Sequence, residues 1–476
     1  MSVAGLLHRD HRPKRTRGRS AAAVTLGAVM AAGVLGACGG GSSSSTSPAQ
    51  AAAAKPATSI TVWNSVLNND NWQGALLKGF TKATGIKVNL ENFPQASLTT
   101  KLSVAQTAHS TAYTLFEDPE SETSNYLATQ SVAPITSFLA SKTLTPASYD
   151  ASGIPSSEVK QCTVGGVQYC EPNFLDGGPV LYYNKQIFAQ AHLTPPTTWA
   201  QVETDANMLT TPAHAGVCIR GSIAAPNGYP VLLMLPYFLP YAPNYQGEYL
   251  NSDWKPLFDT PQALTWAKEY ETLMQKDTPK GVAAFSYTDC VNSLNAGKSA
   301  MFWDDSSLEP TVLNPKVSKL ADDINVDELH CPSFNQSCLL SAPWGMFINK
   351  NVSAADQAAG WKFIEYMTSP SSQLAAFKFQ GDDPSVATRP ATLQYILKNA
   401  AKYGLNESAI AGLDYGSQHI EPNAIPVSAA FNPIQNSLFA VLSEMITGQV
   451  DPQKALTSLQ SQMITTLKTF GLPKKG

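Results

Sequence analysis

Three tryptophans in this sequence lie where a chain can present an aromatic ring to a small solute. Trp63 ends a strand-like run, Trp303 follows another, and Trp344 comes directly after Pro343. Open α/β sheets bind ligands beyond the carboxyl ends of their strands. A sugar has a C–H face that stacks on an indole and hydroxyls that bind Asp, Glu and Asn. Each tryptophan alone is more often a core residue, but the three together predict that at least one lines a carbohydrate site.

Pairs of adjacent acids occur at Glu117-Asp118, Asp304-Asp305 and Asp382-Asp383. A glycosidase needs two carboxylates roughly 5 to 10 Å apart across a sugar ring, whereas neighbours on a strand point to opposite faces. These acids therefore cap helices, lie in solvated loops or bind hydroxyls. The sequence contains no GxSxG, HExxH, P-loop or GxGxxG motif, and its seven histidines are scattered. These observations predict a binding protein rather than an enzyme, with no cofactor.

Tyr182 and Tyr183 have a second interpretation, because adjacent tyrosines ligate ferric iron in some periplasmic binding proteins. The run Val180 to Lys185 reads better as a strand before a turn. We therefore predict no metal at this position.

The first residues indicate export. A basic head with six Lys and Arg precedes an uncharged run, Ala21 to Ala37, that is slightly shorter than the roughly 20 apolar residues that span a bilayer. The run ends in Leu35-Gly36-Ala37-Cys38, which resembles a bacterial lipoprotein box. We expect residues 1–37 to be a signal peptide and Cys38 to carry lipid on the outer face of the cytoplasmic membrane. Residues 38–59 lack large apolar side chains, which predicts a flexible tether.

An odd number of cysteines supports this interpretation. If Cys38 of the seven is lipidated, six remain for disulfides in an oxidising compartment. Six cysteines allow fifteen pairings. Proximity in sequence favours Cys162–Cys170, Cys218–Cys290 and Cys331–Cys338. The alternative, a metal site, has neither a CxxC motif nor a histidine at ligand spacing.

The charge of the mature chain excludes several partners. Without the leader, 26 Lys and Arg stand against 35 Asp and Glu, a net charge near −9. This balance argues against nucleic acid and against an anionic membrane face. A body of more than 400 residues exceeds one ordinary hydrophobic core, so we expect two lobes.

The periodicity of apolar residues predicts alternating strands and helices. Strands are expected from Ile60, Ile86 and Val180, and a helix is expected over residues 71–84. Three further helices have clear start signals: Thr260 before Pro261, Ser353 with Asp356, and Asp451 before Pro452. Their apolar stripes are expected to be core.

The order of several segments resembles the family 1 extracellular solute-binding proteins, the group that contains maltose-binding protein. The segments are Ile60 to Trp63, Thr84 to Val88, Leu181 to Lys185 with Pro195 to Trp199, Asn295 to Met301, Trp361 to Pro370, and Gly448 with the last helix. Each is weak alone, but their order and spacing are specific and span nearly the whole mature chain.

The resemblance implies an α/β, two-lobe, type II periplasmic-binding-protein fold that closes over its ligand. Lobe 1 is expected over residues 60–175 and 305–343, and lobe 2 over residues 176–304 and 344–476. The crossing segments are expected at residues 173–178, at residues 304–307 and near Trp344. Position in the family pattern suggests cleft residues, which together with Trp63 are Asn64, Asn68, Asp118, Glu120, Asp176, Asn227, Tyr229, Trp303, Asp304, Asp305, Trp344, Arg389, Phe431 and Asn432.

We therefore predict a monomeric lipoprotein that delivers a sugar to the permease subunits of an ABC importer. Its closure is expected to be a hinge motion without a covalent step. Two alternatives remain: a binder of a phosphorylated polyol or another polar solute, for which Arg389 is the one cationic cleft candidate, and a secreted glycosidase. A stretch rich in Pro and Tyr around Tyr237, Tyr241 and Tyr245 departs from the family pattern, as do the extra disulfides.

Overall fold

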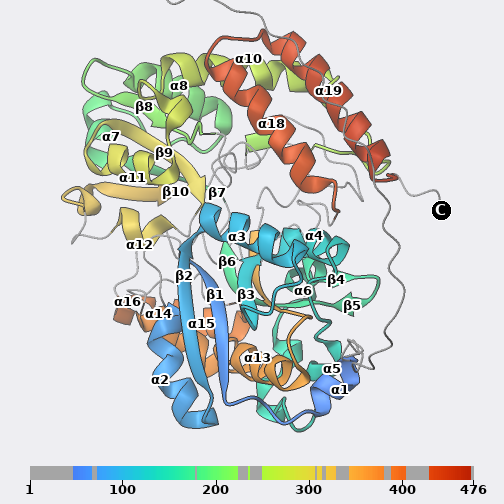
Figure 1. Cartoon of the computed structure of the whole chain (residues 1–476). Helices are drawn as coiled ribbons and strands as arrows, with labels where there is room; N and C mark the ends of the chain where they lie inside the picture. The colour runs from blue at the N-terminus through green and yellow to red at the C-terminus, as the bar shows by residue number, and fades with distance from the viewer. Residues whose placement is uncertain are drawn as a thin grey trace, which may run out of the picture. The chain divides into compact units, whose positions relative to one another are not determined.

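The computed structural model describes most of the chain that follows the predicted leader (Figure 1). The described residues are 47–66, 72–176, 179–222, 234–235, 249–305, 308–313, 318–327, 342–379, 388–403 and 428–472. The predicted signal peptide and Cys38 lie outside them. Within these ranges, no helix combines the length and the apolar character that crossing a bilayer requires.

A five-stranded sheet forms the first half of the fold, in the order β2-β1-β3-β11-β6. Its strands are β1 (Ser59–Val66), β2 (Lys87–Pro94), β3 (Leu115–Pro119), β6 (Cys170–Asp176) and β11 (Ala342–Ile348). β1 is parallel to β2 and β3, and β11 is antiparallel to both β3 and β6. The carboxyl ends of β1, β2, β3 and β6 therefore meet at one edge.

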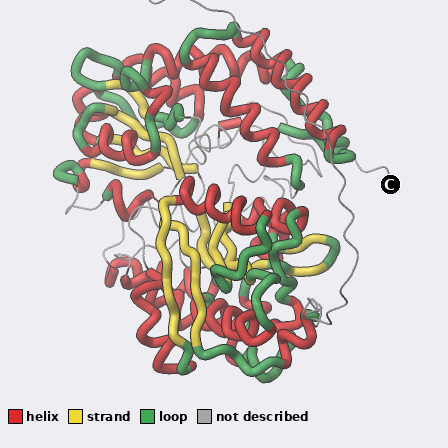
Figure 2. Tube along the Cα trace, in the orientation of Figure 1, coloured by secondary structure: helices red, strands yellow, loops and turns green. Residues whose placement is uncertain are grey.

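Helices cover both faces of this sheet (Figure 2). One face packs against α2 (Trp72–Thr84), α13 (Ala354–Met367), α14 (Pro370–Phe379) and α15 (Pro390–Lys398). The other packs against α3 (Gln95–Thr107) and α4 (Thr123–Ala128). The first sheet thus lies between two separate hydrophobic clusters.

A second, four-stranded sheet has the order β10-β7-β9-β8. Its strands are β7 (Pro179–Asn184), β8 (Ala215–Cys218), β9 (Ser299–Asp305) and β10 (Ile324–Asp327). One face packs against α7 (Lys185–Ala191), α8 (Trp199–Leu209), α10 (Pro261–Lys276), α18 (Phe431–Ile446) and α19 (Pro452–Thr469). The other packs against α11 (Tyr287–Asn295) and α12 (Glu309–Val312). The predicted α/β, two-lobe fold class is confirmed.

The expected helix starts are confirmed by their hydrogen bonds. The Thr260 side chain accepts from the Ala263 N–H at the start of α10, with Pro261 in the first turn. Ser353 and Asp451 accept in the same way at the starts of α13 and α19. These contacts satisfy N–H groups that have no partner inside the helix.

The chain crosses between the sheets at places that only partly match the expected ones. The predicted crossing at residues 173–178 is confirmed, because β6 ends the first sheet at Asp176 and β7 opens the second at Pro179. The crossing predicted at residues 304–307 is wrong. After β9, Leu308 packs in the second sheet's core and β10 pairs with β7. The return therefore lies between β10 and β11.

This pairing also corrects the expected limits of the lobes. Strand β10, from the segment 305–343, belongs to the second sheet, whereas most of β11 and helices α13 to α15, from the segment 344–476, pack with the first. The cause is strand pairing. β11 pairs with both β3 and β6, and the helices that follow it cover an apolar face of the first sheet.

Part of the expected tether is helical. Helix α1 (Pro48–Ala53) starts with a capping box of Ser47 and Gln50, and its Ala51 and Ala52 are buried in the first core. A small side chain is sufficient here because α1 packs closely on α13. The described chain is therefore held to the first core from residue 48 onward.

Two of the three predicted disulfides lie in the described residues, Cys162–Cys170 and Cys218–Cys290, and both are confirmed. Cys331 and Cys338 lie outside them. Val164 pairs with Val167 around a two-residue turn between these cysteines. Gly165 and Gly166 both have positive φ there, as a tight hairpin turn of this length requires. Cys162 consequently lies opposite Tyr169 and reaches the next residue for its disulfide.

Candidate functional site

The polar ends of the two sheets are neighbours in the chain. Only residues 177 and 178 separate β6 from β7, and three residues span at most about 11 Å. Ala342, at the start of β11, pairs with Asp176, and Pro179 pairs with Asp305. The carboxyl edge of the first sheet and the end of β9 therefore form one polar region, which we call the strand-end site.

The first sheet contributes carboxyl groups with neutral partners. At the end of β3, Asp118 accepts a short hydrogen bond from the Tyr126 hydroxyl, and Glu117 accepts one from the Asn173 amide. Asn64, near the end of β1, donates to Asn92 at 3.0 Å. The family resemblance suggested Asn64 and Asp118 as cleft residues, and the structure places Asn64 within β1 and Asp118 in β3. Asn173, in the bulged strand β6, was not among the predicted site residues.

Burial of these acids changes their proton affinity. The pKa of Asp118 is raised well above its usual range, first by burial and then by the nearby Glu122 and Glu117. Burial also raises the pKa of Glu122, which the Asn125 and Asn432 amides lower in part. The first sheet's edge therefore holds negative charge only at a cost, and favours a partner that donates hydrogen bonds.

The second sheet contributes acids that are paired with a cation. Arg220 follows β8 and makes a two-pronged ion pair with Asp304, both side chains being at most 4% exposed. Asp305 lies 3.8 Å from the same guanidinium, and its backbone carbonyl accepts from the Tyr182 hydroxyl at 2.7 Å. Arg220 was missed in the sequence, although its place directly after a strand was a usable signal.

One predicted cleft residue contacts the opposite core. Asn432, in the first turn of α18, donates its amide to Glu122 at 2.6 Å. Glu122 belongs to a short 3-10 helix, η1 (Glu120–Glu122), directly after β3. The strand-end site is thus lined from both cores.

The three tryptophans are not brought together. Trp63, Trp303 and Trp344 belong to three different hydrophobic clusters, and none exposes more than 4% of its surface. Trp63 stacks on Tyr113, and Trp303 packs edge-on against Trp199. This packing favours the alternative that each is a core residue, because an indole must be exposed to stack on a sugar.

Arg389 and Phe431 also lie in cores. Arg389 precedes α15 and donates to the backbone carbonyls of Thr368 and Asp150, at 2.9 and 2.7 Å. Phe431 is buried among the helices of the second core. Asn68, Asn227 and Tyr229 lie outside the described residues, and Asp176 is described only by its backbone, so those four predictions remain predictions.

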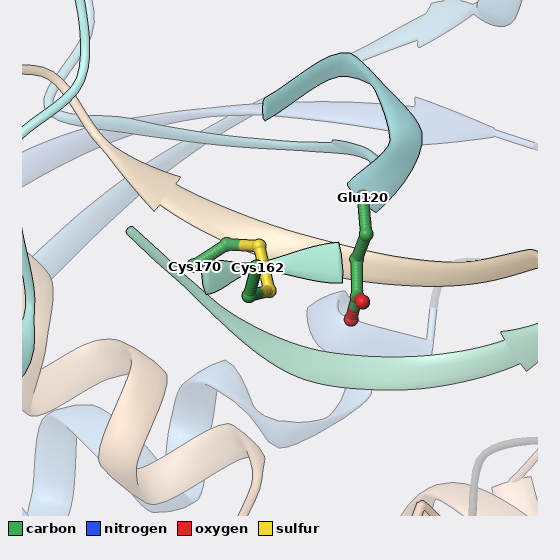
Figure 3. A group of neighbouring side chains, drawn as sticks. All are labelled: Glu120, Cys162 and Cys170. Atoms are coloured by element: carbon green, nitrogen blue, oxygen red, sulfur yellow. A yellow bond between two sulfur atoms is a disulfide. The ribbon is translucent and has the colours of Figure 1, made fainter. Parts of the chain in front are cut away.

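Glu120 points away from the strand ends toward the Cys162–Cys170 disulfide (Figure 3). Its carboxyl group and the two sulfur atoms lie within 4.8 Å of one another. Sulfur atoms joined in a disulfide are not the thiolates that bind metal. Glu120 is fully buried, and its pKa is raised well above the usual range by burial and by Glu158 and Glu171. Its predicted role as a cleft residue finds no support here.

The two adjacent tyrosines do not form a joint iron site. Tyr182 packs in one core of the second sheet and Tyr183 in the other, as alternation along β7 requires. Their hydroxyls contact the Asp305 carbonyl and the Asn325 amide, respectively. They are strand residues, as the sequence suggested.

Comparison with known proteins agrees with this architecture. The model of the family described as bacterial extracellular solute-binding protein matches residues 65–374. A mannitol-binding protein of Pseudomonas aeruginosa is 23% identical over 344 residues, covering 69% of this chain and 76% of that protein. A solute-binding protein of Agrobacterium vitis with bound D-mannitol superposes with a TM-score of 0.72 at 21% identity, over 88% of this chain and 100% of that chain. A maltose-bound protein of T. maritima gives 0.71 at 18% identity, over 86% and 100%.

Proposed function

Because the chain belongs to the family of bacterial extracellular solute-binding proteins, we propose that it is the substrate-binding protein of an ABC importer and binds a sugar or polyol. Family membership implies an extracytoplasmic location. Proteins similar to this chain bind mannitol and maltose. These relatives support a hydroxyl-rich solute for the strand-end site.

The observation that carries the proposal is the chemistry of the strand ends. Asp118, Glu122 and Asp305 place carboxyl oxygens at adjoining strand ends, with Asn64, Asn173 and Asn432 beside them. Carboxylates accept hydrogen bonds from hydroxyls, and side-chain amides both accept and donate them. A hydroxyl-rich solute would therefore be held by hydrogen bonds, and hinge motion at the crossing segments would close the site.

A phosphorylated solute suits these groups less well. Beyond the predicted leader the chain has only two arginines, Arg220 and Arg389. Arg220 is paired with Asp304, and Arg389 is held by backbone carbonyls in the first core. Lys101, at the ends of β1 and β2, is paired with Glu91. Binding of phosphate usually depends on cationic donors, so the acidic strand ends favour an uncharged or positively charged solute.

Calorimetric titration of the folded chain with D-mannitol, ribitol, D-tagatose and maltose tests the proposal. We expect saturable binding of at least one of them, and weaker or no binding of mannitol 1-phosphate. The same protein, incubated with a panel of glycosides, should cleave none of them. Cleavage would identify an enzyme, and binding of the phosphate ester alone would reject the proposed solute class.

We also propose that Cys38 is lipidated and holds the protein on the outer face of the cytoplasmic membrane, near its permease partner. Cys38→Ala should move the protein from the membrane fraction to the soluble fraction. The folded domain should contain no free thiol in either protein, since six cysteines remain for three disulfides. A free thiol among those six would contradict the assignment.

A further inference from the structure

The first sheet's edge has an excess of hydrogen-bond acceptors. Asn64 Oδ1, Asp118 Oδ1 and Asn173 Oδ1 have no hydrogen-bond partner among the described residues, although each side chain is at most 2% exposed. One amide N–H of Asn64 is used in its hydrogen bond to Asn92, and one of Asn173 in its hydrogen bond to Glu117. Buried polar groups are normally satisfied. These acceptor oxygens can each take a donor from a ligand.

The three acceptors come from neighbouring strands. Trp63 pairs with Phe116, which sets Asn64 beside Glu117. Asp118 pairs with Gly345 of β11, and Gly345 pairs with Pro172, the residue before Asn173. Alternation puts Asp118 on the opposite face from Asn64 and Glu117. A solute at the strand ends can therefore contact either Asp118 or the Asn64 and Glu117 side chains directly. It still lies within the electrostatic field of the residues on the other face.

Acidic side chains cluster at this edge. Glu117, Asp118 and Glu122 lie within six residues, and the partners described for Asp118 and Glu122 are the neutral groups of Tyr126, Asn125 and Asn432. Opposite charges attract strongly in a site from which water is excluded. Lys101, at the ends of β1 and β2, lies over the rings of Trp63 and Phe93 and pairs with Glu91. Among the described residues, Asp118 and Glu122 therefore have no cationic partner at this edge.

We propose that the solute carries a protonated amine beside its hydroxyls, so that the site selects an amino sugar or an aminopolyol. This inference rests on the proposed function and narrows its solute class. An ammonium group supplies three donors and one positive charge, and accepts nothing. It meets both deficits of the edge, whereas a hydroxyl supplies one donor and no charge.

The pH dependence of binding follows from the groups around Asp118. Burial raises the pKa of Asp118 most, and Glu122 and Glu117 raise it further; the hydroxyl of Tyr126 donates to Asp118, with Tyr113 close to Tyr126. A bound ammonium favours the ionised carboxylate. Affinity for an amine should rise with pH as Asp118 ionises, until the free amine loses its own proton. Affinity for an uncharged polyol should not rise.

Matched solutes test the inference on the full folded chain. Calorimetry would compare D-mannitol with 1-amino-1-deoxy-D-mannitol, and D-glucose with D-glucosamine, between pH 5 and pH 8. We expect the amine of at least one pair to bind at least tenfold more tightly at pH 8, and the ratio to fall toward pH 5. Asp118→Asn should abolish most of that preference. Glu158→Gln, a buried acid on α6 (Ser156–Gln161) that is not one of the strand-end residues, is the matched control and should keep the preference.

The outcomes separate this inference from the proposed function. If the uncharged member of a pair binds as well as its amine, the inference is wrong and the proposed function stands. If no member binds, and maltose, ribitol and tagatose also fail, both are rejected. Should Asp118→Asn not fold, the pH series on the unaltered chain decides, because a preference independent of pH would exclude a role for this carboxyl group.

Discussion

The two sheets hold buried acids at their adjoining ends in different ways. At the end of β9, Asp304 is neutralised by Arg220, and the pair is closed on itself. At the end of β3, Asp118 accepts a hydrogen bond from the Tyr126 hydroxyl, and its pKa is raised by burial and by its acidic neighbours. A carboxylate that is paired with a cation has its charge neutralised by the protein. A buried carboxyl group without a cationic partner can instead accept a hydrogen bond or an ion pair from a ligand. The first sheet therefore carries the selectivity, and the second provides a fixed wall.

The strongest test of this comparison is removal of the second sheet's cation. Arg220→Ala would leave Asp304 buried beside no positive partner, which typically costs about 3 to 5 kcal/mol of unfolding free energy. Chemical denaturation of the ligand-free protein measures the loss. Lys255→Ala is the control, because its ion pair with Asp259 is exposed and such pairs contribute about 0 to 1 kcal/mol. Equal effects of both changes would contradict a closed Arg220–Asp304 pair.

Replacement of the tryptophans at the strand ends should have effects of similar size. Trp344→Ala and Trp303→Ala each remove a buried indole from one of the two sheets, and such a change costs about 3 to 5 kcal/mol of unfolding free energy. Thermal melts of the ligand-free variants, beside titrations with the bound solute, separate core from site. If a variant is as stable as the unaltered protein but binds the solute more weakly, that tryptophan is part of the binding site.

The disulfides differ between the two regions in loop length. Cys218–Cys290 joins residues 72 apart in sequence, and Cys162–Cys170 joins residues 8 apart. Loop-closure entropy assigns about 4 kcal/mol to the longer loop and about 2.5 kcal/mol to the shorter. Paired Cys→Ser variants of each disulfide, compared by denaturant unfolding, should keep this order. A larger loss from the hairpin disulfide would show that strain or packing, rather than chain entropy, dominates.

The sequence predicted the elements better than the site. Strands and capped helices follow from local patterns, so the starts of β1, β7, α10, α13 and α19 were predicted to within one residue. The lobe limits depend on the pairing of β10 and β11, which are short strands far from their partners in the sequence. The prediction that a tryptophan lines the site also depends on tertiary packing. Periodicity predicts the end of a strand but not the hydrophobic cluster into which a side chain packs. Arg220 could not be paired with Asp304 without knowing that β8 and β9 are neighbours.

The smallest expected effect concerns an acid of the first region that has no cation near it. Both carboxyl oxygens of Glu158 are buried without a hydrogen-bond partner, and burial raises the pKa of Glu158 from 4.5 to about 8. The folded state therefore binds a proton that the unfolded state releases above about pH 4.5, so this group's contribution to stability is full below pH 4.5 and is lost as the pH rises toward 8.

Glu158→Gln removes this proton requirement. It should stabilise the protein by about 1 to 3 kcal/mol at pH 8 and leave it nearly unchanged at pH 4, the gain being limited because the glutamine amide is also buried without a partner. Denaturant unfolding at both pH values measures the difference, and Asp289→Asn, an exposed acid that caps α11, is the control for general charge effects. A gain that is largest at acid pH would have the wrong sign for a buried acid without a cation. It would mean that the first region neutralises its acids with a positive partner, as the second region does.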